Sequence, residues 1–471
     1  MPPPEPNPLN IPDAAAIAAP APAPERGLAR LRQWFQDGLL RRVFRNASIL
    51  LSGKTLAGLL SLGALAVTAR ALGPELFGIL ILIENYMRLV TGLAKFQSWQ
   101  AVIHFGAHCL EQDRRRDLQG LIRFTTLLDV ASAVLGTGVA VAVAPIVGPW
   151  LGWGPEVVPL AMLYSVMILF TLNATPTGIL RLFDRFDLLA TQSVVTPALR
   201  LVGVCGAYLA DAGLGAFLLV WLVSGVVGRL VLLGIAWREF SRQGLMAGMS
   251  LSLRRLVKPH PGLWRFVWST NFSTSLNVLS NRGRTLAVGW VLDPAAAGLF
   301  AVAREFADII HKPVMHLGHV IYPDLAKLSA QDGLKSFRRL MVQSGLVAGT
   351  AVTLVLAVLI GLGKPILALT VGDAYLGAYG VFVLLALASA IRVFAFPLRP
   401  ALVAAGRPHV LLRVQLVLAV LFFALLLALL WRIGLIGAGI AAIAVVVAEF
   451  GVLTIIVRRW LNRQARLSRP D

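Results

Sequence analysis

Long apolar runs dominate this sequence and constrain its fold more than any other feature. A bilayer core of ~30 Å needs about 20 helical residues, and about twelve runs of that length carry few charged residues. We expect them at residues 48–69, 77–100, 121–144, 157–177, 190–210, 214–237, 266–291, 297–320, 340–362, 377–397, 410–431 and 434–457. Runs this continuously apolar exclude barrel strands, which alternate in polarity. The sequence therefore predicts an all-α polytopic membrane protein.

Two short motifs repeat at a fixed spacing. LGPELFG, from Leu72, stands between the first two runs, and LDPAAAG, from Leu292, stands between the seventh and eighth. The fourth run ends in PTGILRLFDRFDLL from Pro176 and the tenth in PLRPALVAAGRPHVLL from Pro397, again at a similar offset. We therefore expect two six-helix halves related by an axis along the membrane normal and facing a central cavity, which is a plan of transporters.

The remaining segments complete a predicted domain plan. Residues 1–25 are rich in Pro and Ala and are expected to form a disordered tail, and residues 26–45 form a basic amphipathic segment that we expect to lie on the inner leaflet. An alternative for the latter is a basic flank that only fixes topology. The six-helix halves then span 46–240 and 265–458, joined by a linker at 241–264 and followed by a basic tail at 459–471.

The net charge of +20, from 43 Lys and Arg against 23 Asp and Glu, is explained by topology. Most of the cations fall in loops on one side of the predicted spans, and that side is expected to be cytoplasmic. Both termini are then cytoplasmic, and the basic loops attract anionic membrane lipid. A nucleic-acid partner is not needed to account for the charge.

Cations inside the apolar runs are the informative residues, because a charge at membrane depth costs ~2.5–3.5 kcal/mol and usually faces a cavity. Several gather on the helices that begin each half, and arginine binds phosphate through its planar fork. We predict an anion- and sugar-binding lumen lined by Arg88, Lys95, Asn277, Arg282, Arg284 and Arg304. The alternative is that the lysines extend to the interface, Arg282 and Arg284 pair locally and the asparagines serve helix packing.

Charged residues at matching positions of the two halves suggest a gate. Glu84 and Arg88 are four apart in the second run, and 220 residues later Arg304 and Asp308 have the opposite order of signs. Facing each other, Glu84 would meet Arg304 and Arg88 would meet Asp308. The alternative is an ordinary pair within each helix, worth ~0.2–0.5 kcal/mol when exposed.

Isolated acids and histidines complete the search for chemistry. Asp129 and Glu449 are candidates for coupling to H⁺ or Na⁺, although either could pair with Arg200 or Arg229 instead. We expect no resident cofactor or metal: His311, His316 and His319 lack positioned acids. SILLSGKT, from Ser48, lacks the first glycine and the preceding strand of an ATP-binding loop.

Longer stretches of the chain resemble a known family. The runs are ARALGPELFGILILIENYMRLVTGLAKFQSWQAVIHFGA from Ala69 and PTGILRLFDRFDLLA from Pro176, with weaker matches at WSTNFSTSLNVLSNRGRTLAVGWVL from Trp268 and AGLFAVAREFADII from Ala297. They are similar to the lipopolysaccharide (O-antigen type) polysaccharide flippases. That family shares a MATE-like superfamily with multidrug extruders and lipid II flippases.

The resemblance implies a function. A flippase of this kind would move a polyprenyl-pyrophosphate-linked oligosaccharide across the bacterial inner membrane by alternating access, and other polysaccharide-assembly proteins are possible partners. The pyrophosphate would sit against Arg88, Arg282, Arg284 and Arg304. The alternatives are a drug extruder of the same fold, which an arginine-lined cavity argues against, and a membrane polymerase or glycosyltransferase. Such an enzyme usually has a larger outer loop than this chain offers.

Overall fold

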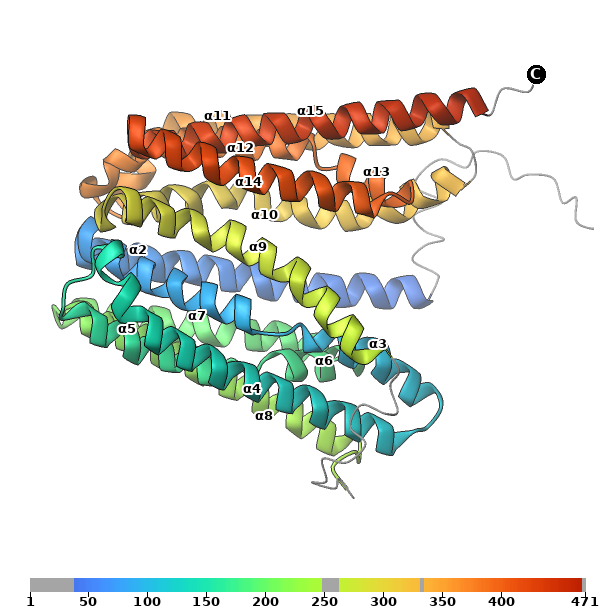
Figure 1. The fold of residues 1–471 in the computed structure, drawn as a ribbon, viewed down its shortest axis with the longest axis horizontal. Coiled ribbons are helices and arrows are strands. Elements are labelled where there is room, and N and C mark those ends of the chain that lie inside the picture. Colours follow the sequence, from blue (N-terminus) through green and yellow to red (C-terminus); the bar gives the residue numbers. More distant parts are fainter. Residues whose placement is uncertain (1–37, 248–261, 331–333, 468–471) are drawn as a thin grey trace, which may run out of the picture.

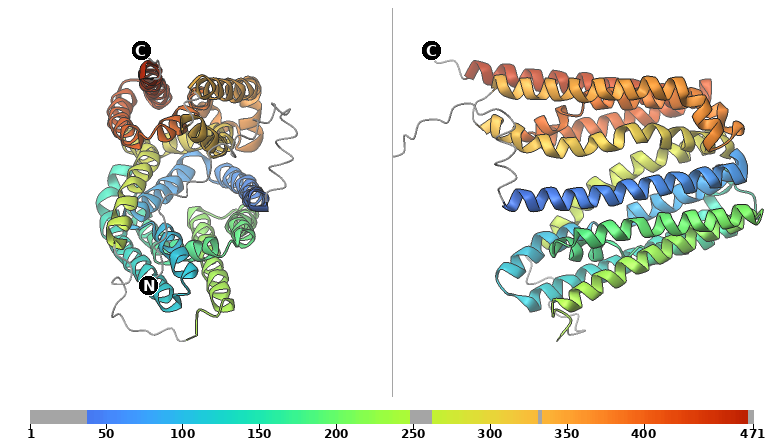
Figure 2. Two further views of the ribbon diagram at one scale, coloured as in Figure 1. Left: turned by 90° about the vertical axis from the view of Figure 1, so that its right-hand side faces the viewer. Right: turned by 180° about the vertical axis from the view of Figure 1, so that it is seen from behind.

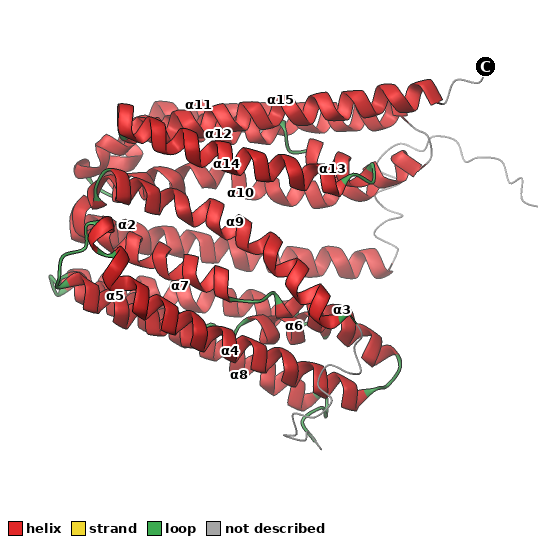
Figure 3. Cartoon of the chain, in the orientation of Figure 1, coloured by secondary structure: helices red, strands yellow, loops and turns green. Residues whose placement is uncertain are grey.

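The computed structural model describes residues 38–247, 262–330 and 334–467, and these residues form helices joined by short loops (Figure 3). The helices of the N-terminal half are α2 (Gly38–Ala94), α3 (Ser98–Glu111), α4 (Arg115–Val147), η2 (Pro149–Leu151), α5 (Val157–Ser165), η3 (Val166–Phe170), α6 (Ala174–Leu182), α7 (Phe186–Leu209) and α8 (Leu214–Arg242). Those of the C-terminal half are α9 (Leu263–Val291), α10 (Pro294–Ala330), α11 (Leu334–Thr370), η4 (Asp373–Ala378), α12 (Tyr379–Phe394), α13 (Leu398–Ala404), α14 (Pro408–Ile433) and α15 (Leu435–Leu467).

The long α2 contains the first predicted span and most of the second, whose last residues fall in the following loop and α3. Its backbone leaves the helical conformation at Gly73, with φ 69° and ψ 172°, and the chain reverses direction there (Figure 1). A positive φ favours glycine, and the following Pro74 is well suited to start the second helix. LGPELFG is therefore the turn of a helical hairpin, and LDPAAAG forms the turn between α9 and α10 at the same end of the molecule.

Both halves also break their fourth span at the repeated proline motif. The fourth span of the first half is divided into α5, η3 and α6, and its counterpart into α12 and α13. Each motif contains a residue with positive φ, Asp184 at 55° and Gly406 at 72°. The hydrogen bonds match as well: Arg185 N donates to Leu180 O at 2.8 Å, and Arg407 N donates to Leu402 O at 3.0 Å. The repeat is thus one of backbone geometry, although the side chains differ.

The two halves meet where the repeated hairpin turns interlock. A Cβ at Gly298 would lie 3.2 Å from the Cα of Gly78, and a Cβ at Gly78 would overlap the carbonyl oxygen of Pro294. Both glycines are therefore required for a backbone-to-backbone approach of α2 and α10. Leu80, Leu82 and Ile83, just after this turn in α2, are fully buried.

Helix α9 crosses from one half to the other (Figure 2). It packs against α2 and α3 of the N-terminal half and against α10 and α14 of the C-terminal half. Leu263 and Val267 are fully buried in a cluster of the N-terminal half, and Trp268 packs edge-to-face on Phe96 with ring centroids 5.1 Å apart. The predicted boundary between the halves at residue 265 therefore falls in a helix that both halves share.

Exposed apolar side chains cover the outer helices, as expected of a lipid-facing surface. Leu209 is 84% exposed and Leu369 is 79% exposed. Within the described residues, nine stretches are long and apolar enough to cross a membrane, and Ser48–Glu111 counts as one of them. Helices α9 and α10 are not among these stretches. The prediction of an all-α multi-span membrane protein is confirmed.

The flanking segments are described only in part. The predicted Pro-rich tail lies outside the described residues, as does most of the amphipathic segment and of the linker. Residues 38–45 of that segment continue directly into α2, and α15 runs on to Leu467, inside the predicted C-terminal tail. Both described ends of the chain, the start of α2 and the end of α15, lie at the same end of the bundle (Figure 1).

Candidate functional site

The predicted gate residues form pairs within their own helices in this structure. Arg88 Nε donates to Glu84 Oε1 on α2, and Arg304 Nε lies 4.0 Å from Asp308 Oδ2 on α10. Tyr164 on α5 also donates to Glu84, so the carboxylate is held from two helices. These are the pairs of the within-helix alternative, and the cross-cavity pairing stays a prediction for another conformation.

Further arginines surround Glu84 from the N-terminal half. Arg200 on α7 and Arg229 on α8 lie close enough for their charges to act on the Glu84 carboxylate. Arg200 is stacked over the ring of Trp221 at 4.2 Å. Both arginines were alternative partners for Asp129 or Glu449 on the sequence alone. In the structure Glu84 is the carboxylate whose charge acts on both.

Three of the predicted lumen arginines come together where the two halves face each other. Arg282 on α9 lies within electrostatic range of Arg88 on α2 and of Arg304 on α10. Arg304 Nη1 donates to Asn281 O at 3.1 Å and to Thr285 Oγ1 at 3.2 Å, which fixes its side chain against α9. Three guanidinium groups from three helices therefore share one region, in which Glu84 and Glu305 supply negative charge.

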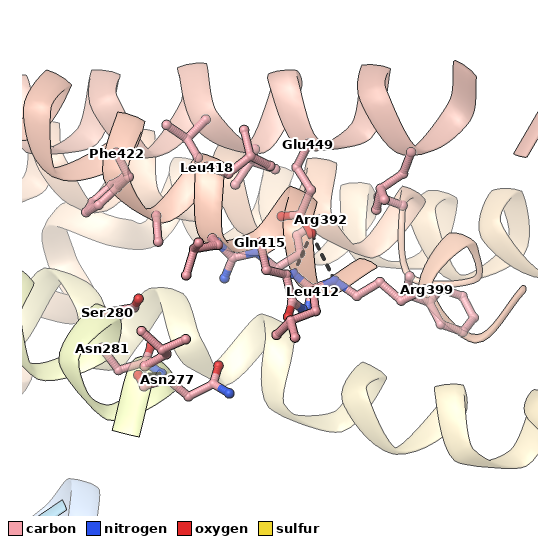
Figure 4. Close-up of a pocket in the computed structure, with 18 of the residues that line it drawn as sticks. Asn277, Ser280, Asn281, Arg392, Arg399, Leu412, Gln415, Leu418, Phe422 and Glu449 are labelled. Atoms are coloured by element: carbon pink, nitrogen blue, oxygen red, sulfur yellow. Dashed lines mark hydrogen bonds and ion pairs between the residues drawn. The ribbon is translucent and has the colours of Figure 1, made fainter. Parts of the chain in front are cut away.

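Arg284 instead lines a cavity within the C-terminal half. Figure 4 shows other residues of this cavity, among them Arg392, Arg399 and Glu449. The cavity has a volume of about 690 Å³ and lies between α9, α12, α13, α14 and α15. Of the six predicted binding residues, Asn277 and Arg284 line it. Arg392, Arg399 and Glu449 contribute charged groups from the other helices.

Sequence reasoning missed Arg392, Arg399 and Tyr164. Arg392 lies in the apolar run 377–397, so the signal that identified Arg282, a cation at membrane depth, was present there too. The predicted lumen instead drew on the helices that begin each half. Arg399 lies two residues beyond the predicted run.

Lys95 and Asp129 lie apart from these groups, at the break between η3 and α6. Asp129 accepts hydrogen bonds from Ser98 Oγ at 2.7 Å and from Thr175 N at 2.9 Å. Lys95 Nζ donates to Thr171 O at 2.9 Å, and the charges of Lys95 and Asp129 attract each other. The pair therefore holds the broken span in place. Glu449 is ion-paired to Arg399, with Oε1 2.9 Å from Nε.

The motifs set aside in the sequence have ordinary structural roles where they are described. Residues 48–55 lie in the continuous helix α2, which leaves no loop to surround phosphates. His104 stacks on Phe266 with centroids 5.2 Å apart. No group of three His, Cys, Asp or Glu within the described residues is arranged to hold a metal, and the side chains of His311, His316 and His319 lie outside the description.

Comparison with known proteins identifies the family. The profile of a family described as "Polysaccharide biosynthesis protein" matches residues 43–329. The chain belongs to the polysaccharide biosynthesis protein family. It is 36% identical over 350 residues to "Inner membrane protein YghQ" of Escherichia coli (strain K12), a match that covers 74% of this chain and 98% of that protein. This member of the family is thus a multi-pass inner-membrane protein.

Solved structures confirm the fold of this polysaccharide biosynthesis protein. An inward-facing multidrug resistance MATE family transporter of the MOP superfamily superposes with a TM-score of 0.70 at 14% identity, covering 88% of this chain and 96% of that one. An outward-facing structure described in the same way gives 0.60 at 15% identity, covering 90% and 96%. The lipid II flippase MurJ, in an inward closed conformation, gives 0.64 at 15% identity, covering 90% and 93%.

The family and fold separate the alternatives raised by the sequence. The expected MATE-like architecture is confirmed, and a polysaccharide biosynthesis family with this fold favours a transporter over a polymerase or glycosyltransferase. The family description does not specify an O-antigen cargo.

Proposed function

We propose that this protein moves a polyprenyl-pyrophosphate-linked oligosaccharide, an O-antigen or exopolysaccharide repeat unit, across the inner membrane by alternating access. The family description supports a cargo of polysaccharide assembly, and the fold supports alternating access between two halves. The fold shared with MurJ, a lipid II flippase, supports a lipid-linked cargo. Both termini of the chain are cytoplasmic in this proposal.

The observation that carries the proposal is the gathering of guanidinium groups at membrane depth. Arg88, Arg282 and Arg304 lie together between the halves, and their mutual repulsion opposes the folded state. An anionic cargo would offset that cost, because phosphate oxygens accept paired hydrogen bonds from arginine. We propose that these three residues bind the pyrophosphate during transport.

The other predicted residues have distinct proposed roles. Asn277 and Arg284 act in the C-terminal cavity, and Lys95 supports the broken span from within the N-terminal half. Coupling to H⁺ or Na⁺ through Asp129 or Glu449 remains a prediction. Both acids hold structural partners in this conformation, so any titration would accompany a change of those contacts.

The test is a leaflet-resolved assay of lipid-linked oligosaccharide in a strain lacking the protein, together with its surface polysaccharide. We expect repeat units to accumulate facing the cytoplasm and surface polymer to be lost. Complementation with Arg282→Gln should leave the defect, whereas complementation with Arg338→Gln, an exposed control on α11, should correct it.

Two results would contradict the proposal. Lipid-linked units that accumulate facing the periplasm would place the defect after transport. Unchanged lipid pools in a strain without a redundant exporter would favour a drug extruder, although arginines between the halves would repel cationic drugs.

A further inference from the structure

The cavity of the C-terminal half carries more positive than negative charge. Arg284, Arg392 and Arg399 line it, and Glu449 is the carboxylate among its lining residues (Figure 4). Glu449 is already bound by Arg399 through two guanidinium nitrogens. The cavity therefore holds a neutralised pair and two further cations.

No ion pair within 4 Å is seen for the other two arginines, Arg284 and Arg392, in the described residues, although the charges of Asp308 and Glu449 attract both from further away. The Arg284 guanidinium is stacked over the ring of Phe422 at 4.3 Å, and its buried Nε has no hydrogen-bond partner in the described part of the chain. Arg392 lies close enough to Arg284 for their charges to repel each other. A buried donor without a partner is costly, so a ligand that supplies acceptor oxygens here would be bound favourably.

The other walls show what that ligand would resemble. Asn277, Ser280 and Asn281 on α9 face the arginines, and Gln415 on α14 adds a second amide surface (Figure 4). Amides and hydroxyls of this kind hydrogen-bond sugar hydroxyl groups. The remaining surface, which includes Leu412, Leu416 and Leu418, is apolar and suits a hydrocarbon chain. The volume of about 690 Å³ falls within the range of small-molecule sites.

We propose that this cavity binds the diphosphate headgroup and first sugar of an amphiphilic anion, entirely within the C-terminal half. The diphosphate oxygens accept hydrogen bonds from Arg284 and Arg392, the sugar lies along α9, and the start of the lipid chain contacts α14. The inference rests on the proposed function for the identity of the cargo. It differs by placing the headgroup in this conformation beside Arg284 and Arg392. Arg304 lies at the edge of that site, since it donates to the backbone oxygen of Asn281 and its charge acts on Arg284.

The test measures binding of farnesyl pyrophosphate to the purified full-length protein in nanodiscs, by calorimetry. Arg284→Gln and Arg392→Gln should each weaken binding about 10-fold or more, because each removes a charge-assisted contact. Arg338→Gln should leave it unchanged. Glu449→Gln should bind as tightly as the parent protein or more tightly, since it removes the competing carboxylate. A merely structural role of these residues predicts weaker binding for all three cavity variants.

Competing ligands separate the sources of the diphosphate. Displacement by inorganic pyrophosphate, but not by cardiolipin, supports the proposal. Equal displacement by cardiolipin would assign the cavity to a membrane lipid headgroup and overturn it, as would unchanged binding in the Arg284 and Arg392 variants. If either variant fails to fold, Gln415→Leu tests another wall of the same cavity. This variant should weaken the binding of a sugar-bearing diphosphate more than the binding of farnesyl pyrophosphate.

This experiment fails separately from the proposed function. Binding is measured without transport, so normal lipid pools in the deletion strain would refute flipping and leave a cavity site standing. Conversely, a flipping defect together with unaffected binding in the cavity variants would move the cargo to the arginines between the halves.

Discussion

Individual polar residues inside this bundle have structural roles that their position in the sequence does not reveal. Asp129 is an isolated acid in an apolar run, which predicts a proton or ion carrier. In the structure it instead connects three segments, since it accepts from Ser98 on α3 and from the backbone of Thr175 on α6. The broken span leaves backbone donors unpaired within the membrane, and Asp129 satisfies one of them.

We therefore expect Asp129→Ala to destabilise the protein by about 1–3 kcal/mol, because the amide of Thr175 would be left without an acceptor. Asp129→Asn should lose less stability, since its amide oxygen can still accept a hydrogen bond. The measurement is the apparent Tm of the purified variants, with Glu111→Ala on exposed α3 as control. An Asn variant that is fully stable but inactive in export would instead identify Asp129 as a coupling acid.

Among the helices, the repeated features are those that set backbone geometry. The fourth spans break at matching places, and the turns at Asp184 and Gly406 share their hydrogen bonds. The hairpins after Leu72 and Leu292 bring Gly78 and Gly298 into backbone contact. Small residues allow such close packing where no side chain would fit. The halves are therefore joined at this end by two glycines.

Gly78→Ala should prevent the halves from closing at this end, because its methyl group would overlap the Pro294 carbonyl oxygen. We expect export activity to fall about 10-fold or more, which corresponds to ~1.4 kcal/mol. Gly58→Ala is the matched control, since nothing lies within 4 Å of a Cβ at that helical position. Complementation of a deletion strain, with the amount of membrane-inserted protein measured in parallel, gives the answer. Wild-type activity in Gly78→Ala would show that this contact is not needed for transport.

For the whole molecule, the conformation matters as much as the fold. The TM-score is 0.70 to the inward-facing transporter and 0.60 to the outward-facing one. The contact of Gly78 with Gly298 closes the end of the bundle opposite the described chain ends. If the chain ends are cytoplasmic, this conformation is closed toward the outside, and the proposed charge gate would act when the halves move.

A double charge reversal tests that gate. Glu84→Arg and Arg304→Glu should each abolish export, because each places like charges together, and the two combined should restore it if the residues meet across the cavity. The within-helix exchange, Glu84→Arg with Arg88→Glu, is the control, since it preserves the pair seen here. Restoration by the control alone, in normally expressed protein, would mean that the pairs act only within their helices.

Much of the fold is determined by local features of the sequence. Apolar runs of about 20 residues predict spans, because an unpaired peptide group in lipid is costly wherever it occurs. The repeated Pro and Gly positions predict matching turns, because these residues set the local backbone conformation. Such signals depend only on neighbouring residues, and the structure confirms the helices that they predict. The breaks in the fourth spans were not foreseen, since their apolar pattern is uninterrupted.

The candidate site was harder to predict because its parts come from distant segments. The cations at membrane depth were identifiable from their cost alone, but Arg282 and Arg284, two residues apart, face different surroundings. Side chains two positions apart on a helix point in different directions, and only the packing of α9 between the two halves determines the surroundings of each one.

The sequence by itself determined that this chain is a helical membrane protein with two related halves and costly internal cations, because those properties follow from composition and short-range pattern. Only the tertiary structure decided which charges share a space. In it Tyr164 donates a hydrogen bond to Glu84, Arg399 pairs with Glu449, and Arg284 and Arg392 line the same C-terminal cavity. The reason is physical: partners of a buried charge are chosen by distance in space, and helices far apart in the chain supply them.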